Sequence, residues 1–225
     1  MKKIKGIIFD FNGTLFWDTP KHEEAWLKYA KDILGLDISK EEYYANIHGS
    51  TNRLIYEYLY KKPIPQEIAD TFGMEKEEYY RDLCYKEKDN LTLGKGAAEL
   101  LDYLVKNNIP HAIATSSEIS NVRFYKEIFP LEKWFDDEHI IYDDGTVKGK
   151  PEPDIYLKSG AKLGIQMKDL AVVEDALNGV RSAKSAGAGL VIGIAPDGKE
   201  KFLGKEYTDI IIEDFLSFPK EIFEK

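Results

Sequence analysis

The chain has 225 residues, of which 43% are hydrophobic and 12% aromatic, so it can bury a core and hold one domain with a modest second one. A formal net charge of −9 without a basic block argues against nucleic-acid binding but leaves small anionic substrates open. The single cysteine, Cys84, excludes an intrachain disulfide, no apolar run approaches the roughly 18 residues of a membrane span, and no signal peptide is recognised. These features predict a soluble, cytoplasmic protein with neither a membrane nor a nucleic-acid partner.

A short apolar strand near the start of the chain ends in an acid. Ile7, Ile8 and Phe9 are β-branched and aromatic, which predicts a strand buried on both faces, and Asp10 follows directly. Open α/β sheets place their ligand crevice at the carboxyl ends of the strands. Burying a carboxylate there is costly without a partner, so Asp10 predicts that other parts of the chain supply one.

The next segment, residues 15–90, is predicted to be entirely helical. Thr19 and Pro20 are typical of a helix start, Gly35 ends that helix, and Ser39 begins a second one with a capping box. Further helical patterns cover residues 51–60, 65–72 and 74–88. No stretch of this insert alternates in the manner of a strand.

From Leu93 onward, predicted strands alternate with predicted helices. Short apolar runs predict strands over residues 111–115, 170–173, 190–194 and 209–212. Helical patterns begin near residue 94 and then cover residues 120–129, 153–163 and 177–187, with a last helix at the end of the chain. Residues 139–142 and 146–147 predict a hairpin around Asp143-Asp144-Gly145.

This order of elements predicts an α/β protein with a doubly wound parallel sheet, covered by helices on both faces. Residues 1–14 and 91–225 form the predicted core domain. Residues 15–90 form a smaller, all-helical domain that is inserted after the first strand.

Polar groups follow three of the predicted strands at their carboxyl ends. Asp10 follows the first strand, Thr115 and Ser116 end the second, and Glu174 and Asp175 end the third. Because the ends of parallel strands meet along one edge, we expect these side chains to gather there. Three carboxylates would repel one another, and a hard divalent cation removes this repulsion. Carboxylates with a substrate phosphate suit Mg²⁺, which is the predicted cofactor.

Lys150 adds a positive charge to this predicted site, on a segment stiffened by Pro151 and Pro153. The hydroxyl of Thr115 and the following backbone N–H groups can hold phosphate oxygens at a helix N-terminus. The set predicts phosphoryl transfer through an aspartyl-phosphate on Asp10, with Mg²⁺ and Lys150 neutralising the developing charge. Water or a second hydroxyl then accepts the phosphoryl group.

These residues resemble the haloacid dehalogenase (HAD) superfamily, in the branch that includes β-phosphoglucomutase and small-molecule phosphatases. The resemblance covers the core in the family's order, with motifs at residues 9–14 (FDFNGT), 114–117 (ATSS), 150–154 (KPEPD) and 173–179 (VEDALNG). It implies a Rossmann-like core with Asp10 as nucleophile. It also implies Mg²⁺ bound by the Asp10 side chain, the Asn12 backbone carbonyl and the pair Glu174 and Asp175.

The same resemblance makes residues 15–90 the family's cap domain. It suggests His22 as a substrate-side or proton-relay group, with a surface histidine as the equal alternative. Residues 48–53 (HGSTNR) look like the cap's substrate loop, in which Thr51 and Arg53 contact the substrate. For Arg53 the alternative is an arginine on a helix surface.

Asn12 departs from the family pattern, which usually has a second Asp two residues after the nucleophile. That Asp protonates the leaving group and later activates water, whereas an amide has no titratable proton. General acid–base help contributes roughly 10²–10⁴-fold, so its loss weakens catalysis without abolishing it. A mutase needs this group twice in each cycle, so Asn12 counts more heavily against a mutase.

The sequence therefore predicts a Mg²⁺-dependent phosphatase that acts on a small phosphorylated metabolite, a sugar phosphate first of all. A monomer is expected and a dimer is left open. The alternatives are a β-phosphoglucomutase-like phosphotransferase and a catalytically weakened protein that binds a phosphorylated ligand or a protein partner. A dehalogenase would leave the pair Glu174 and Asp175 unexplained. A phosphonate hydrolase needs a cap lysine that the sequence does not identify.

Overall fold

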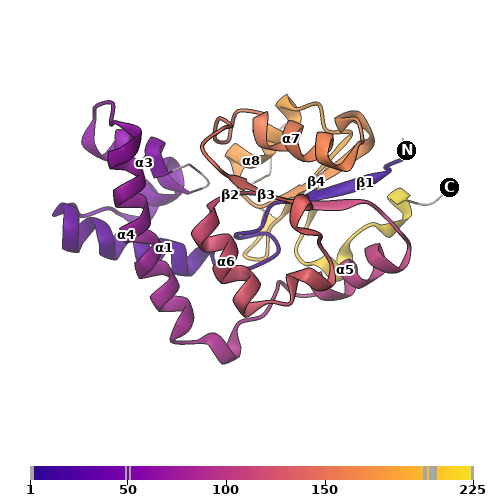
Figure 1. Cartoon of the computed structure of the whole chain (residues 1–225), viewed down its shortest axis with the longest axis horizontal. Helices are drawn as coiled ribbons and strands as arrows, with labels where there is room; N and C mark the ends of the chain where they lie inside the picture. Colours follow the sequence, from indigo (N-terminus) through magenta and orange to yellow (C-terminus); the bar gives the residue numbers. More distant parts are fainter. Residues whose placement is uncertain (1–2, 49, 51, 200–201, 203–206, 224–225) are drawn as a thin grey trace. The chain divides into compact units, whose positions relative to one another are not determined.

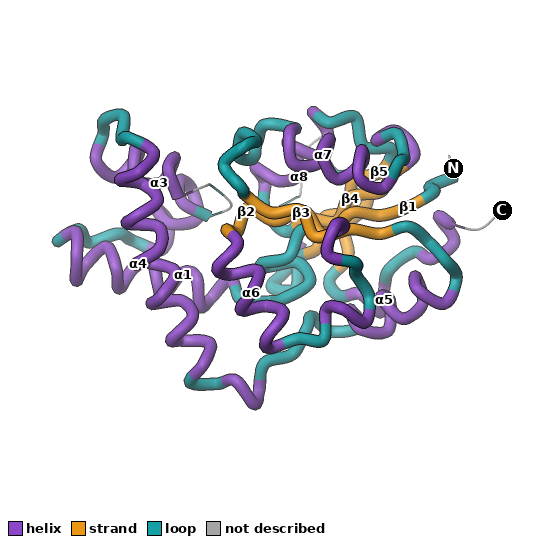
Figure 2. The backbone as a smooth tube through the Cα atoms, viewed as in Figure 1, coloured by secondary structure: helices purple, strands orange, loops and turns teal. Residues whose placement is uncertain are grey.

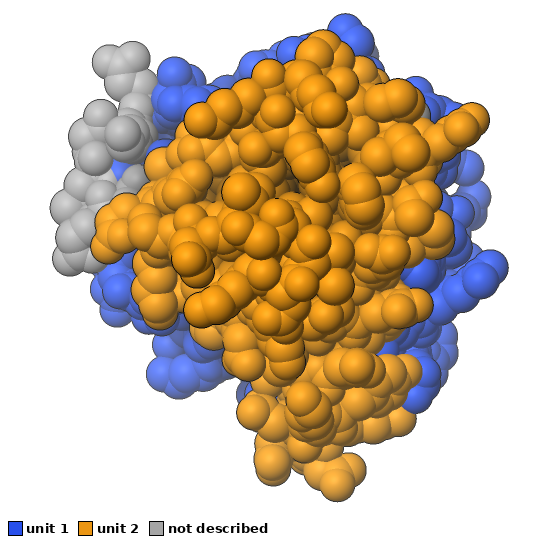
Figure 3. Space-filling model, turned by 90° about the vertical axis from the view of Figure 1, so that its left-hand side faces the viewer, with its two compact units in different colours: residues 1–17, 92–225 blue, residues 18–91 orange. Residues whose placement is uncertain are grey.

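The computed structural model describes residues 3–48, 50, 52–199, 202 and 207–223. The chain divides into two compact units, one of residues 1–17 and 92–225 and one of residues 18–91 (Figure 3). We call them the core unit and the helical unit. The sequence predicted the inserted helical domain at residues 15–90.

The core unit is built on a six-stranded sheet in the order β3-β2-β1-β4-β5-β6, and all five strand pairs are parallel (Figures 1 and 2). Its strands are β1 (Gly6–Phe9), β2 (His111–Glu118), β3 (Ile140–Asp143), β4 (Leu170–Glu174), β5 (Leu190–Ile194) and β6 (Ile210–Ile212). Every residue of the adjacent strands β1 and β4 is buried, as expected for apolar runs covered on both faces. The predicted doubly wound parallel sheet is therefore confirmed.

Helices cover both faces of this sheet. They are α5 (Ala97–Lys106), α6 (Ile119–Ile128), α7 (Asp154–Leu163) and α8 (Leu177–Ser185). Helices α7 and α8 lie on one face, and α5 and α6 lie on the other (Figure 2). The α7–α8 face carries a large apolar cluster that includes Ile8, Tyr156 and Val172. This packing holds the strand ends in a fixed arrangement.

Two sequence-based expectations for the core unit are wrong. The segment predicted as a hairpin contributes only β3, which pairs in parallel with β2, and residues 146–147 are not a strand. The Asp143 and Asp144 side chains instead accept hydrogen bonds from the backbone N–H groups of Gly145 and Thr146, which makes a local turn. The predicted last helix consists of two short 3₁₀ segments, Phe215–Ser217 and Lys220–Phe223.

In the helical unit, the described residues contain helices and no strand. The helices are α1 (Thr19–Tyr29), α2 (Lys40–Glu42), α3 (Asn52–Tyr60) and α4 (Gln66–Tyr85), with π-helical turns at Ala30–Leu34 and Tyr43–Ile47. The predicted cap of the second helix is present, since Ser39 Oγ accepts from the Glu42 N–H at 3.1 Å. The core of this unit is aromatic, with Trp26, Tyr29 and Tyr56 in mutual ring contact. No helix in the described part of the chain is long and apolar enough to cross a membrane.

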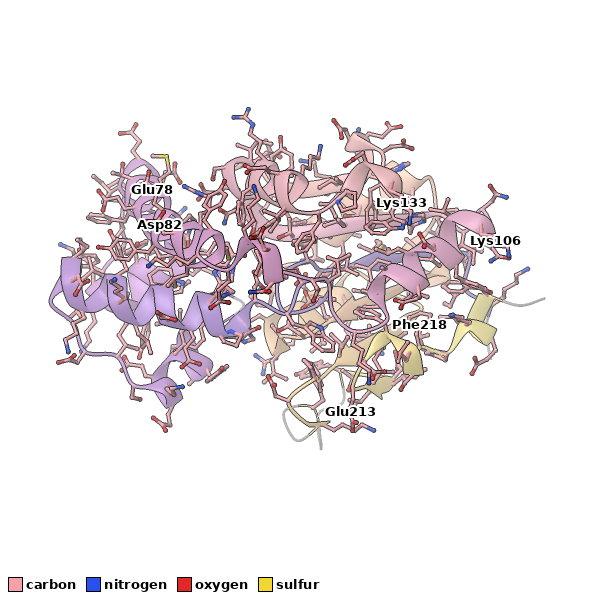
Figure 4. All side chains as sticks on the ribbon, turned by 90° about the horizontal axis from the view of Figure 1, so that it is seen from below. Glu78, Asp82, Lys106, Lys133, Glu213 and Phe218 are labelled. Carbon is pink, nitrogen blue, oxygen red and sulfur yellow. The ribbon has the colours of Figure 1, made fainter. Side chains whose placement is uncertain are left out.

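Helix α4 has a buried face and an exposed face. Lys76, Tyr80 and Cys84 lie four residues apart along it and are buried, whereas Glu78 and Asp82 are exposed (Figure 4). Burial, followed by the negative charge of Asp18, raises the pKa of the Cys84 thiol to about 12. The thiol therefore stays protonated at neutral pH, as expected for a structural cysteine.

We expect iodoacetamide at pH 8 to alkylate Cys84 in the folded protein at least about tenfold more slowly than in urea, because alkylation needs an accessible thiolate. Intact-mass measurements over time give both rates. Equal rates in the two conditions would contradict the burial and the raised pKa.

Candidate active site

Three buried carboxylates gather where β1 and β4 end. The two strands are neighbours, with Phe9 opposite Val173, so Asp10 and Glu174 leave the sheet side by side. The Asp10 N–H extends the pairing by donating to the Val173 carbonyl at 3.0 Å. Asp10, Glu174 and Asp175 each place one carboxylate oxygen within 4.8 Å of the others. The structure therefore brings together the three acids that the sequence singled out.

Lys150 lies inside this cluster and joins two of its acids. Its Nζ donates to Asp10 Oδ1 and to Glu174 Oε1, both at 2.6 Å, and to the Ala114 carbonyl at 3.3 Å. The lysine is buried, with only 3% of its surface exposed. It comes from the segment between β3 and α7. The loop that carries the predicted third motif, residues 150–154, therefore reaches the sheet edge and places the Lys150 ammonium group beside Asp10.

Glu174 is held in place by donors on several sides. Its Oε1 also accepts from the Tyr156 hydroxyl at 2.6 Å, and its Oε2 accepts from the N–H groups of Asp175 and Ala176 at 3.1 and 3.3 Å. The Tyr156 ring also lies against Lys150, with Nζ 5.2 Å from the ring centroid. Tyr156 was not predicted as a site residue, because the sequence does not show which residue the hydroxyl of a helical tyrosine contacts.

Asp175 is oriented by the turn that follows β1. The Thr14 hydroxyl donates to Asp175 Oδ1 at 3.3 Å, and Thr14 is fully buried. The turn itself is closed by backbone bonds from Thr14 and Phe16 to the Phe11 carbonyl. The first and fourth predicted motifs are therefore linked side chain to side chain. Sequence reasoning quoted Thr14 within its motif but gave it no role.

The charges in this cluster perturb one another. Burial, together with the charges of Glu174 and Asp175, raises the pKa of Asp10 well above its ordinary value, and the opposing effect of Lys150 does not offset it. Burial alone would lower the pKa of Lys150, but the carboxylates of Asp10 and Glu174 outweigh burial and raise it. Three carboxylates thus face one ammonium group in a buried space. A cation bound there would favour the ionised form of Asp10.

The donor set fits Mg²⁺. It consists of carboxylate oxygens, which hard divalent cations prefer, and these oxygens are close enough together to share one ion. It contains neither a cysteine nor a histidine, the ligands that typically accompany carboxylates in zinc sites. A divalent cation bound here would offset the excess of negative charge around Lys150.

Gly179, in the first turn of α8, gives Glu174 the room that it occupies. A Cβ atom built on Gly179 would lie 1.9 Å from the Glu174 carboxyl group, a distance at which the carboxyl has to move. The same carboxyl group accepts hydrogen bonds from Lys150 and Tyr156. Glu174 can therefore make these bonds only because residue 179 has no side chain.

We expect Gly179→Ala to lower the free energy of unfolding by about 1–3 kcal/mol, because Glu174 is displaced from its donors. Helix propensity alone predicts the opposite sign, a gain of about 1 kcal/mol for Ala over Gly. Urea unfolding followed by circular dichroism measures the change, with Arg181→Ala on the exposed side of the same helix as control. A gain in stability for Gly179→Ala would contradict the close approach of Glu174.

The end of β2 supplies hydroxyl groups next to Asn12. Thr115, which is buried, donates to Asn12 Oδ1 at 3.3 Å and accepts from the Ser117 N–H at 3.1 Å. Ser116 lies between them on β2 and is half-buried. The strand continues to Glu118, three residues beyond the predicted strand over residues 111–115.

The predicted site residues of the helical unit lie in different settings. Arg53, on α3, is exposed and pairs with Glu57 at 3.1 Å, and Thr51 lies outside the described residues. His22, on α1, stacks on Tyr80 with ring centroids 3.8 Å apart. Their roles toward a substrate stay predictions.

A buried lysine next to His22 escaped sequence reasoning. Lys76 Nζ lies 3.0 Å from His22 Nδ1 and 2.7 Å from Glu77 Oε1, and it also lies 5.2 Å from the Trp26 ring centroid. On the other side of His22, Nε2 is 3.3 Å from Asp18 Oδ2. A lysine in a helix ordinarily indicates a solvated face, so only the contacts of the folded unit show that Lys76 is buried.

Comparison with known proteins places the chain in a family. The model of the haloacid dehalogenase-like hydrolase family matches residues 4–187. Hexitol phosphatase A of Escherichia coli is 32% identical over 194 residues, which cover 86% of this chain and 85% of that protein. Phosphorylated carbohydrates phosphatase of Thermotoga maritima is 27% identical over 226 residues, covering 97% of this chain and all (100%) of that protein.

A solved structure supports the same family assignment. A HAD hydrolase, family IA, variant 3, from Entamoeba histolytica is 40% identical with a TM-score of 0.88, and the match covers 98% of this chain and 97% of that one. The resemblance inferred from the four sequence motifs is thereby confirmed. The chain belongs to the haloacid dehalogenase-like hydrolase family.

Proposed function

We propose that this hydrolase is a Mg²⁺-dependent phosphatase that releases phosphate from small phosphorylated metabolites through an aspartyl-phosphate on Asp10. The observation that carries the proposal is the buried cluster of Asp10, Glu174 and Asp175 around Lys150, at the carboxyl ends of β1 and β4. Phosphoric monoester hydrolysis is the chemistry that this cluster supports best. Two family relatives are also named as phosphatases, a hexitol phosphatase and a phosphorylated carbohydrates phosphatase.

In the proposed reaction, Asp10 attacks phosphorus with one carboxylate oxygen and the ester oxygen leaves. Lys150, already bonded to Asp10, balances the negative charge that gathers around the transferred group. The Thr115 hydroxyl positions a phosphate oxygen, and the leaving alkoxide takes a proton from solvent. Water then attacks the phosphorus of the aspartyl-phosphate, breaks its bond to the Asp10 oxygen and returns one proton to solvent, so that phosphate is released. Asp10 returns as a carboxylate, so atoms and charges balance over the cycle.

Mg²⁺, when bound, would neutralise phosphate charge next to the nucleophile. Asp10, Glu174 and Asp175 would hold it through their side chains, and Asn12 through its backbone carbonyl. Glu174 has a second role, because it fixes the Lys150 ammonium beside Asp10. Removing the metal therefore leaves a folded site with an intact Lys150–Asp10 pair that lacks the charge needed to accept phosphate.

We propose a sugar phosphate as the substrate class, which the names of the two relatives support. Ser116 in the core unit, and His22, Thr51 and Arg53 in the helical unit, are the candidates for substrate contact. Substituting each by alanine and measuring KM on the best substrate tests these assignments one by one.

The test of the proposed function is phosphate release from a panel of phosphomonoesters, including hexose, hexitol and glycerol phosphates. With Mg²⁺ we expect turnover of at least one sugar phosphate, and with excess EDTA we expect a loss of about 10²-fold or more that Mg²⁺ restores. The proposal fails if no ester is hydrolysed faster than by an Asp10→Ala control. It also fails in its metal part if EDTA leaves the rate unchanged.

A further inference from the structure

The side chain of Asn12 forms part of a ring of hydrogen bonds. Asn12 Nδ2 donates to the Tyr125 hydroxyl at 2.7 Å, and Asn12 Oδ1 accepts from the Ser117 hydroxyl at 2.8 Å. The two hydroxyl oxygens of Ser117 and Tyr125 lie 3.0 Å apart. Three residues from the turn after β1, from β2 and from α6 thus meet in one ring, which we call the amide ring.

Counting hydrogens fixes the direction of each bond in the amide ring. A hydroxyl has one hydrogen, and Ser117 uses its hydrogen on Asn12 Oδ1, which can only accept. The bond between the two hydroxyls therefore uses the hydrogen of Tyr125, whose oxygen accepts from Asn12 Nδ2. Each member donates once and accepts once around the ring, an arrangement in which hydrogen bonds strengthen one another.

This ring needs an amide at residue 12. A carboxylate accepts at both oxygens and donates nothing. With Asp at this position, Ser117 and Tyr125 would each turn their hydrogen toward the carboxylate, and no hydrogen would remain between the two hydroxyl oxygens. The carboxylate would also accept from Thr115, and it would add a further acid two residues after Asp10 in a region that already holds three buried carboxylates.

The amide ring fixes the turn that carries the nucleophile. Tyr125 is buried, with 1% of its surface exposed, and its ring stacks on Phe11 with centroids 4.4 Å apart. Phe11 lies between Asp10 and Asn12 in the chain, so Tyr125 contacts the turn through both a ring and a hydroxyl. Thr115, the proposed phosphate-binding residue, also donates to Asn12 Oδ1. One side chain therefore ties the nucleophile's turn to the phosphate-binding strand.

We propose that Asn12 is a positioning residue: its amide closes the ring with Ser117 and Tyr125 and holds the Asp10 turn against β2 and α6. It is not a weakened version of an acid at that position, and it donates no proton to the leaving group. This inference rests on the proposed phosphatase function for its catalytic consequence, whereas the ring itself is a property of the fold.

The first test separates positioning from lost acid catalysis. The rates of Asn12→Asp and of the unaltered enzyme are measured with p-nitrophenyl phosphate, a good leaving group, and with glycerol phosphate, a poor one. We expect Asn12→Asp to lower kcat on both substrates and to keep the ratio of the two rates within about threefold. Any larger gain for the poor leaving group would mean that the introduced carboxyl group acts as an acid, and would overturn the proposal.

The second test asks whether the three residues act as a unit. Tyr125→Phe keeps the aromatic ring stacked on Phe11 and removes the hydroxyl group that belongs to the amide ring. We expect Tyr125→Phe and Asn12→Ala each to lower kcat by about fivefold or more with little change in KM, and the double variant to lose no more than the larger single loss. Ser117→Ala should lose activity and Ser117→Thr should regain it. Multiplicative losses in the double variant, or no rescue by Thr, would overturn the proposal.

Urea unfolding of the unaltered protein, the two single variants and the double variant gives a measurement that does not depend on activity. The two single substitutions should couple, so that Tyr125→Phe destabilises the Asn12→Ala background less than it destabilises the unaltered protein. Tyr103→Phe on α5, where the ring lies 4.9 Å from Lys220 Nζ, is the matched control and should show no coupling. If no phosphomonoester is hydrolysed, the proposed function fails, but these unfolding measurements still test the amide ring. Additive effects of the two single substitutions on the free energy of unfolding would overturn the proposed ring.

Discussion

Asp10→Asn should lower kcat for phosphate release by at least about 10³-fold while the protein stays folded. The substitution keeps the size of the side chain, and the amide oxygen can still accept the hydrogen bond from Lys150. An amide is a poor nucleophile toward phosphorus, so the reaction through the enzyme-bound intermediate stops. A rate assay on the best sugar phosphate, at saturating Mg²⁺, gives the result directly.

The stability of the same variant gives an independent check. Asp10 is buried with Glu174 and Asp175, so removing one of three negative charges relieves repulsion in the metal-free protein. We therefore expect Asp10→Asn to be at least as stable as the unaltered protein without Mg²⁺, although it is inactive. Asp143→Asn, at the end of β3 and outside the cluster, is the control that should keep its activity. If Asp10→Asn retained more than about a tenth of the activity, Asp10 would not be the nucleophile.

Lys150→Met should lower both activity and stability. Met fills much of the space of the lysine stem but removes the charge that bonds to Asp10 and Glu174 at 2.6 Å. Removing one partner from a buried ion pair costs about 3–5 kcal/mol, because the remaining carboxylates stay buried without compensation. Loss of a charge aimed at the developing phosphate charge costs roughly 10²–10³-fold in kcat.

The effect of metal distinguishes this prediction from a simple packing defect. Since Mg²⁺ would supply positive charge to the same carboxylates, adding it should raise the melting temperature of Lys150→Met more than that of the unaltered protein. Lys158→Met, which removes an exposed pair with Asp144, should change neither the activity nor the response to Mg²⁺. An equal response to Mg²⁺ in Lys150→Met and the unaltered protein would show that Lys150 and the metal do not share these carboxylates.

The fold was predictable because its central strands are short, apolar and β-branched. Strands such as β1 and β4 can be found from such runs, and helices between them require parallel pairing. The error at β3 has the same origin, since an apolar run indicates a strand without naming its partner. The turn chemistry of Asp143-Asp144-Gly145 suggested a hairpin, but β3 pairs with β2 instead.

The carboxylate cluster was predictable for a topological reason. Strand ends in a parallel sheet converge, so Asp10, Glu174 and Asp175 were brought together by strand order alone. Residues that act through side-chain contacts from helices carried no such signal. Tyr156 and Tyr125 look like ordinary helical aromatics, and only the folded chain shows that their hydroxyls reach Glu174 and Asn12.

Asn12 is the residue whose interpretation changes most between sequence and structure. In the sequence motif, Asn12 stands where the family usually has an Asp, which predicts weaker catalysis. In the structure its amide both donates and accepts within a ring that contacts the nucleophile's turn. Asn12→Asp would introduce the acid that the family usually has at this position, but we expect it to lower kcat.

The central claim is that Asp10 carries the phosphoryl group during turnover. Acid-quenching the enzyme within milliseconds of mixing with a hydrolysed sugar phosphate and Mg²⁺, followed by peptide mass spectrometry, tests it most directly. We expect a phosphoryl group on the peptide that contains Asp10, absent from Asp10→Asn and lost on longer incubation as phosphate appears. Phosphate release at full rate with no phosphoryl group on this peptide at any quench time would contradict the claim.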